Sequence, residues 1–450
     1  MGATARIARF VTETDYERIP SKALETAKAA LLDCLGVALA GSKEASAKIC
    51  AEIARREGAR EEATVIGQGF RSSALHAAFA NGAAAHALDY DHSFTLMGQP
   101  TAPIIPAALS LGESLGAGGR ELLEAYVAGF EVVAKMALSL REANQDGWHA
   151  PGTLGALGAA AASAKLLRLR ASEIEMALGI TASMASGVVC NFGTMTKPLH
   201  VGLAARNGVL AAKLAQSGYT ANGQALEAGL GFYEVYYRSA AVEEGPIGEL
   251  GGSYELVGSG IRIKPYPCGG LAHPAIDAVL EIRARHGITA ETVETIDVEV
   301  TKHTYNRIAF RIPQTGLQGK FSMGYLLARA VIDGKISLHA FTDSAVRDAN
   351  VLRLAERVHM RLDPNLRSSD AGSRPCKVTV RLRGGETYSR RVEHAKGSRE
   401  APMSSQELTG KFFECARQAI SEESAERVAQ FVERLETLTD IGPLCRLLGP

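Results

Sequence analysis

The sequence has no excess of either charge. Its 49 Lys and Arg residues balance 49 Asp and Glu residues, and it contains neither a basic block nor a zinc-ligand spacing. A chain without net charge lacks the field that draws proteins to phosphate backbones or anionic membrane surfaces. We therefore expect no nucleic-acid partner and no membrane partner, so that any anion must be bound by local groups.

Disulfide pairs and long apolar runs are also missing. The seven cysteines are scattered, odd in number and never form a CxxC pair, which is typical of reduced thiols. The N-terminal segment has no apolar stretch of roughly 7–15 residues before a cleavage site, and no run of about 20 apolar residues occurs anywhere. These absences predict a cytoplasmic protein that is neither secreted nor membrane-spanning.

Aromatic residues are few, with one Trp and 13 Phe in 450 residues. Core volume must then come from Ala, Leu, Val and Ile packed at short distances between helices. Runs of small residues at 155–169 and 204–219 lack the side chains that hold helix backbones apart. We expect both runs to be buried helices of a bundle.

The spacing of apolar residues divides the chain. From Ile19 to about Ala240 it is mainly helical, as in segment 21–41, where Gly41 is the expected C-cap. Helical spacing returns after Lys396. The length of 450 residues also exceeds what a single hydrophobic core usually serves.

Between these helical parts the pattern is mixed. Segments 294–305 and 377–394 show strand signals, and 321–333 and 344–357 show helical spacing. The turn at Gly384 and Gly385 predicts two strands within 377–394. The sequence thus predicts a mainly α fold: a large all-helical domain from 1–259 and 397–450, and an inserted smaller α+β domain, 260–396, with a small antiparallel sheet.

Four ionisable residues crowd the end of a small-residue helix: His86, Asp89, Asp91 and His92. Asp89 or Asp91 is a candidate general base or substrate anchor on a loop held by two buried helices. The alternative is that the acids cap helices and that His86 is a buried structural histidine. The cluster also has the residue types of a metal site, but no second cluster completes one, so we predict no metal.

A second candidate is His149, which directly precedes a Gly- and Ala-rich helix opened by Pro151. Free backbone N–H groups at such a helix start favour a bound carboxylate. His149 is therefore a candidate proton shuttle. The alternative is a histidine packed against Trp148 at a loop corner.

Two lysines stand where a charge is costly unless it is paired. Lys197, followed by His200, opens an Ala-rich segment and favours an anionic ligand. Lys264 lies at the junction of the predicted domains, where ligand sites are common, and His273 begins the next helix. No acyl-transfer constellation surrounds Cys268, which favours a buried structural thiol over a nucleophile.

Nucleotide and cofactor motifs are absent. No GxGxxG, P-loop or GxSxG opens a helix after a strand, and no signature of pyridoxal phosphate, flavin or haem occurs. We therefore expect no cofactor and a chemistry of side chains alone.

Five segments, in order along nearly the whole chain, resemble the MmgE/PrpD family, which includes 2-methylcitrate dehydratase, cis-aconitate decarboxylase and iminodisuccinate epimerase. The resemblance implies a helical domain from both chain ends, an inserted α+β lid, a homodimer, a small polycarboxylate substrate and no cofactor. The segments are NGAAAHALDYDHS (81–93), WHAPGTLGALGAAAA (148–162), KPLHVGLAARNG (197–208), IKPYPCGGLAHPAIDA (263–278) and GSREAPMSSQEL (397–408).

The resemblance also implies roles for single residues. The active-site aspartate and histidine of the decarboxylase branch match Asp89 and His149, its two substrate-binding lysines match Lys197 and Lys264, and its lid tyrosine matches Tyr305. We expect Asp89, His149 and Tyr305 to be catalytic, with the two lysines holding substrate carboxylates.

Two positions depart from that branch. Ser93 stands where the branch has threonine, and Gln99 stands where it has a histidine before proline. A glutamine cannot exchange a proton, so Gln99 counts against decarboxylation. We expect Ser93 and Gln99, together with His200 and His273, to bind substrate.

The predicted function is that of a cofactor-independent lyase that transfers a proton next to a carboxylate of a small di- or tricarboxylate, as 2-methylcitrate dehydratase does. The alternatives are an epimerase of a dicarboxylate of the iminodisuccinate kind and a cis-aconitate-type decarboxylase. A non-enzymatic alternative is a degenerate, dimeric carboxylate-binding protein.

Overall fold

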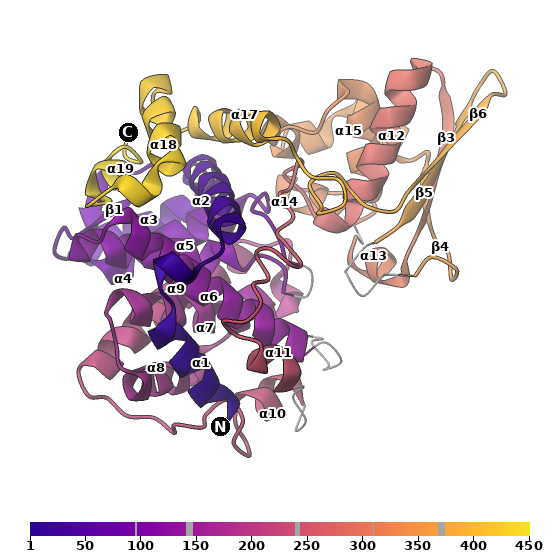
Figure 1. Cartoon of the computed structure of the whole chain (residues 1–450). Coiled ribbons are helices and arrows are strands. Elements are labelled where there is room, and N and C mark those ends of the chain that lie inside the picture. The colour runs from indigo at the N-terminus through magenta and orange to yellow at the C-terminus, as the bar shows by residue number, and fades with distance from the viewer. Residues whose placement is uncertain (95–96, 141–146, 239–243, 309, 368–373) are drawn as a thin grey trace. The chain divides into compact units, whose positions relative to one another are not determined.

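The chain forms two compact units in the computed structural model (Figure 1). The first consists of Met1–Ile263 and Ser404–Pro450, and the second of Lys264–Met403. The structure describes residues 1–94, 97–140, 147–238, 244–308, 310–367 and 374–450.

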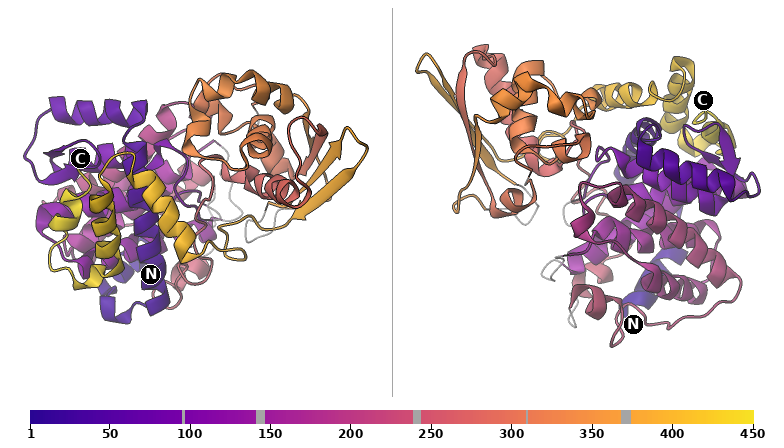
Figure 2. Two further views of the ribbon diagram at one scale, coloured as in Figure 1. Left: turned by 90° about the horizontal axis from the view of Figure 1, so that it is seen from above. Right: turned by 180° about the vertical axis from the view of Figure 1, so that it is seen from behind.

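The first unit is a bundle of helices with one short antiparallel hairpin, β1–β2, that the periodicity of the sequence did not reveal. Both chain ends belong to it, and the C-terminal helices α17 and α18 pack against α2 (Figures 1 and 2). Its elements are α1 (Ala3–Glu13), α2 (Ser21–Gly41), α3 (Ala45–Arg56), β1 (Ala63–Val65), β2 (Phe70–Ser72), α4 (Ala74–Ala87), α5 (Thr101–Leu115), α6 (Gly119–Ser139), α7 (Ala150–Leu166), α8 (Ala171–Met184), α9 (Thr196–Gln216), α10 (Phe232–Tyr237), α11 (Glu244–Gly248), α17 (Ser405–Ala416), α18 (Glu422–Glu433) and α19 (Gly442–Arg446).

Glycines allow the central helices α4, α7 and α9 to approach closely. A Cβ atom on Gly208 would lie 2.5 Å from the Cβ of Ala159, and one on Gly202 would lie 2.5 Å from the carbonyl oxygen of Phe79. The residues of α7 from Pro151 to Ala164 are all buried. The prediction of buried small-residue helices is therefore confirmed for α7 and for α9 up to Ala215, whereas residues 216–219 are exposed.

Gly41 serves a packing role instead of the predicted capping role. It is the last helical residue of α2, and the C-cap is Ser42. A Cβ atom on Gly41 would lie 2.0 Å from the carbonyl oxygen of Ala84 in α4. The residue is glycine because two helix backbones meet here, and the predicted cap is wrong.

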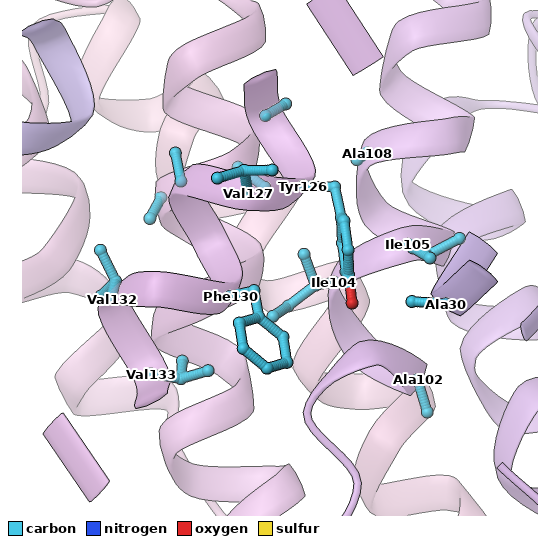
Figure 3. Close-up of a cluster of buried hydrophobic side chains, with 14 of the residues drawn as sticks. Ala30, Ala102, Ile104, Ile105, Ala108, Tyr126, Val127, Phe130, Val132 and Val133 are labelled. Carbon is cyan, nitrogen blue, oxygen red and sulfur yellow. The ribbon is translucent and has the colours of Figure 1, made fainter. Parts of the chain in front are cut away.

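Larger side chains fill the core beside these helices. Tyr126 and Phe130 of α6 belong to one buried cluster with Ile104 and Ile105 of α5 and Ala30 of α2 (Figure 3). The rings of Tyr126 and Phe130 lie 6.0 Å apart between centroids. This cluster fixes the start of α5 against α2 and α6.

The second unit combines helices with a four-stranded sheet of order β4-β3-β5-β6. The residues Val378 and Val380 of β5 are buried, and their neighbour Lys377 faces outward. Helix α12 packs against β5 and β6, and α15 against β4. The elements are α12 (His273–His286), β3 (Val293–Val300), α13 (Lys302–Arg307), α14 (Gly316–Gly319), α15 (Met323–Asp333), α16 (Ala349–Ala355), β4 (Val358–Leu362), β5 (Cys376–Leu382) and β6 (Thr387–Val392).

The mainly α fold with a small α+β portion is confirmed, with two local corrections. The sheet is mixed, because β4 runs parallel to β3, whereas β5 runs antiparallel to β3 and β6 antiparallel to β5. The predicted strand 294–305 ends at Val300, since the Thr301 side chain accepts a hydrogen bond from the Thr304 N–H and starts helix α13. The predicted turn at Gly384 and Gly385 does join β5 and β6.

In the described part of the chain, every helix is too short or too polar to cross a membrane.

Candidate active site

Asp89 is held in an unusual conformation on the turn after α4. Its φ angle of 52° lies in the left-handed region, which costs a non-glycine residue on the order of 1 kcal/mol or more. One of its carboxylate oxygens, Oδ1, lies 3.0 Å from the Nζ atom of Lys197. Strained backbone of this kind is common at functional sites.

Lys197 reaches Asp89 from the first turn of α9. Its side chain is 9% exposed and that of Asp89 is 8% exposed, so this ion pair is nearly removed from water. The ammonium group also lies 5.2 Å from the centroid of the Phe192 ring. A buried lysine needs such a partner, because an unpaired ammonium is costly away from water.

Three buried histidines from three helices meet next to this ion pair. The His149 ring, at the start of α7, lies 5.3 Å from His86 of α4 and 5.3 Å from His200 of α9, measured between ring centroids. The Nδ1 atoms of His149 and His200 are 3.2 Å apart. The His149 ring also meets Phe192 edge-on at 5.0 Å.

The surroundings of His149 correct two expectations. The Gly152 and Thr153 N–H groups donate to the His149 carbonyl oxygen and are therefore not free for a carboxylate. Trp148 contacts the ring of Tyr236, at 4.9 Å. The His149 ring packs instead against Phe192 and two other histidines, so chain neighbours say little about its environment.

Burial favours the neutral form of these histidines. It lowers the pKa of His149 well below its usual value, and His86, Lys197 and His200 lower this pKa further, whereas Asp89 opposes them. Burial also lowers the pKa of His86, against the opposing effect of Asp91, and the pKa of His200. A neutral imidazole can accept a proton, as a general base must.

Three buried polar atoms near the site have no hydrogen-bond partner among the residues that the structure describes: the Nε2 atoms of His86 and His149 and the Oδ1 atom of Asp91. Leaving such an atom without a partner typically costs about 1–3 kcal/mol. In native proteins an ordered water, an ion or a catalytic role commonly accounts for such groups.

His92, at the end of the turn that carries Asp89, is paired with a carboxylate from α2. The His92 Nδ1 atom is 2.8 Å from Asp33 Oδ2, and its Nε2 atom is 2.5 Å from Thr101 Oγ1. The Lys411 Nζ atom, on α17, is 2.6 Å from Asp33 Oδ1 and donates to the Tyr90 carbonyl oxygen at 2.8 Å. This network joins the turn to α2, α5 and α17 of the first unit.

The sequence analysis did not single out Asp33 or Lys411. Both are charged residues within apolar helical stretches, and this is the signal that identifies them as buried and paired. Burial raises the pKa of Asp33, but Lys411 and His92 outweigh it and bring it to about 2.

Two further expected substrate-binding residues lie close to the turn. The Gln99 Nε2 atom is 3.5 Å from Asp89 Oδ1. The backbone of Ser93 exchanges two hydrogen bonds with that of Arg262, at 2.9 and 2.8 Å. The structure thus gathers Asp89, Lys197 and Gln99 directly.

The remaining expected site residues belong to the second unit. Lys264, His273 and Cys268 are buried, and the His273 Nε2 atom lies 3.3 Å from the Cys268 carbonyl oxygen. Tyr305 is on helix α13 and is 44% exposed. That Lys264, His273 and Tyr305 share one site with Asp89 stays a prediction.

No group of three or more His, Cys, Asp or Glu side chains within the described ranges is arranged to hold a metal ion. All seven cysteines are free, and only Cys190 among them is exposed. The burial of Cys268 agrees with the structural thiol that the sequence favours.

Comparison with known proteins connects this geometry to a family. Residues 5–244 match the MmgE/PrpD N-terminal domain, and residues 266–437 match the MmgE/PrpD C-terminal domain. The cis-aconitate decarboxylase of Mus musculus is 29% identical over 444 residues, covering 95% of this chain and 89% of that protein. The Homo sapiens enzyme of the same name is 28% identical over 96% of this chain and 92% of its own. That of Aspergillus terreus is 27% identical over 100% of this chain and 96% of its own.

Proposed function

The chain belongs to the MmgE/PrpD family and is an enzyme of the lyase type, and we propose that it acts on a small di- or tricarboxylate by moving a proton at a carbon next to a carboxylate. The observation that carries this proposal is the buried Asp89–Lys197 ion pair beside His149, whose pKa is lowered by burial. It combines a cation for an anionic substrate with a base for a carbon-bound proton.

Each part of this group suits one requirement of the reaction. Removing a proton beside a carboxylate builds negative charge, which a fixed ammonium group stabilises strongly in a site from which water is excluded. Lys197 would bind the carboxylate, and Asp89 would hold Lys197 in place. His149 would take the proton through its Nε2 atom, which has no partner among the described residues.

We infer that the reaction is the elimination of water from a hydroxy acid similar to 2-methylcitrate. Gln99 supports this choice, because it stands beside Asp89, where the resemblance places an acid–base histidine in the decarboxylases. Decarboxylation of a cis-aconitate-like acid is the second candidate, favoured by the names of the relatives above.

The rest of the proposed site follows the family resemblance. We propose that Lys264 binds a second carboxylate, that Ser93, His200 and His273 line the substrate, and that Tyr305 acts from a lid that closes over it. We further propose a cytoplasmic homodimer that works without a cofactor.

A panel of di- and tricarboxylates followed by proton NMR in D₂O tests the proposal. Elimination of water gives a new vinylic or allylic signal at constant carbon number. Decarboxylation releases carbon dioxide, and epimerisation exchanges deuterium into recovered substrate with loss of optical rotation. If no acid of the panel is converted or raises the melting temperature, the proposed function is wrong.

The lysine is tested with a matched control. We expect Lys197→Met to reduce kcat/KM by about 1,000-fold, because the charge that meets the carboxylate is lost. Lys135 is a buried control, paired with Glu249 and Glu255 and placed outside the site. Lys135→Met should lower the melting temperature with little change in KM, and an equal loss of activity in both variants would contradict the assignment.

A further inference from the structure

The proposed function assigns no role to the buried pair formed by His86 and Asp91. The His86 Nδ1 atom lies 2.8 Å from Asp91 Oδ2, and both side chains are buried. A carboxylate in this position accepts the Nδ1–H and leaves Nε2 as the atom that can take up a proton. Asp91 therefore fixes the tautomer of His86.

His86 is also close to the proposed base. Its ring centroid lies 5.3 Å from that of His149, and the planes are inclined by 32°. Ring nitrogens of two imidazoles at this separation that do not contact each other can be joined by one water, a route by which general acids and bases exchange protons. Both Nε2 atoms lack a partner within the described residues.

We propose that the Asp91–His86 pair is a proton relay for His149 and supplies the second acid–base group that Gln99 cannot be. This inference rests on the proposed function, in which His149 removes the proton. His86 would act through His149 and not on the substrate, since its side chain is fully buried. Asp91 would position His86 and stabilise its protonated form.

The relay balances over one turnover. The substrate C–H bond breaks, its electron pair stays on carbon, and the proton bonds to His149 Nε2. It then passes to His86 Nε2 by exchange with one water, so that His149 is neutral again and the imidazolium of His86 faces the Asp91 carboxylate. The electron pair on carbon forms the C=C bond as the neighbouring C–O bond breaks, and the proton returns by the same path to the departing hydroxide, which leaves as water.

Burial lowers the pKa of His86, whereas Asp91 and Asp89 oppose this effect and would stabilise a proton that His86 takes up during turnover. Lys197, His149 and His200 disfavour a second positive charge, while Asp91 favours the protonated form of His86. The groups involved are Asp89 and Asp91 on the turn, Lys197 and His200 on α9, and His149 at the start of α7.

The test replaces the carboxylate by its amide. In Asp91→Asn we expect kcat to fall about 10- to 100-fold with KM changed less than about threefold, because the relay loses its stabilising charge. The acid limb of the kcat profile should move to lower pH by about one unit, since His86 then binds a proton less readily. His86→Gln should lower kcat to the same extent.

The His92–Asp33 pair provides the matched control. It has the same Nδ1–Oδ2 distance of 2.8 Å and equal burial, but its Nε2 atom is bound to Thr101. Asp33→Asn should lower the melting temperature without moving the acid limb. An unchanged kcat and acid limb in Asp91→Asn, or the same shift in Asp33→Asn, would overturn the relay while leaving the proposed function intact.

A measurement without substrate separates the two proposals. In histidine-selective ¹⁵N NMR, with His149 assigned from its loss in His149→Gln, Asp91→Asn should move the titration midpoint of His149, and Asp33→Asn should not. If the titration midpoint of His149 is the same in Asp91→Asn as in the wild type, the relay is overturned even if no substrate is found.

Discussion

The turn after α4 carries two buried histidine–carboxylate pairs with the same Nδ1–Oδ2 distance of 2.8 Å and opposite surroundings. His92 is bound at both ring nitrogens, and its partner Asp33 is also paired with Lys411. His86 is bound at one nitrogen, and its Nε2 atom has no partner in the described part of the chain.

The difference teaches how a buried polar group is assigned a role. A network in which both ring nitrogens of the histidine are hydrogen-bonded and the carboxylate is ion-paired stabilises one backbone conformation, here that of residues 89–92. A group with an open position carries a cost that a ligand or a proton can relieve. The residues next to His86 and His92 in the sequence do not indicate which of the two histidines has a partner at both ring nitrogens.

The largest effect on activity is expected at His149, whose Nε2 atom, like that of His86, has no partner among the described residues. His149→Gln should reduce kcat about 100- to 10,000-fold, the usual loss when a general base is removed. His92→Gln, the equally buried control, should keep most of its activity per folded molecule. Equal losses in steady-state assays of the two variants would break the comparison.

For the His92–Asp33 pair, we expect substitutions to change the stability of the fold. Asp33→Asn leaves Lys411 buried without its counter-charge, and we expect a loss of about 3–5 kcal/mol in the free energy of unfolding by urea. The double variant Asp33→Asn with Lys411→Met should recover part of this loss, because no uncompensated charge remains. Additive losses would show that the two residues are not coupled.

Close packing of α4 on α9 supports both pairs alike. Gly202→Ala should cost about 1–3 kcal/mol in urea unfolding, because the new Cβ would lie 2.5 Å from the Phe79 carbonyl oxygen. The control is Gly410 in α17, where an added Cβ atom would have no described neighbour within 4 Å. Gly410→Ala should stabilise by up to about 1 kcal/mol, and a loss there would mean that helix contacts do not explain the difference.

His86 and His149 should also differ from Asp33 in the way their pKa values make stability depend on pH. Histidines whose pKa is lowered by burial bind a proton only when unfolded, so stability falls as pH drops below about 6.5, by up to about 1.4 kcal/mol per pH unit for each histidine. The pKa of Asp33 is lowered to about 2, so its contribution is complete above about pH 3.9 and is lost as pH falls toward 2. Urea unfolding from pH 7 to 5 should show a smaller slope in His149→Gln than in the wild type, and the same slope in Asp33→Asn.

The sequence predicted the features that depend on residues near one another in the chain. The helical spacing, the small-residue helices and the turn at Gly384 and Gly385 predicted elements that the structure contains. Strand β4 was missed and β3 was extended too far, because pairing with a distant strand and a cap at Thr301 decide these ends. The role of Gly41 was misread for the same reason: its partner, Ala84, is far along the chain.

The sequence by itself determined the mainly α fold, the family and the residue types of the site, since periodicity and motifs are local properties of the chain. Only the tertiary structure decided which histidine is fully bound and which keeps an open nitrogen. Asp33 of α2 pairs with His92, and Lys411 of α17, near the other end of the chain, pairs with Asp33, while His86, His149 and His200 come from three helices. Partners that the fold brings together set the burial, the charge and thus the reactivity of each imidazole.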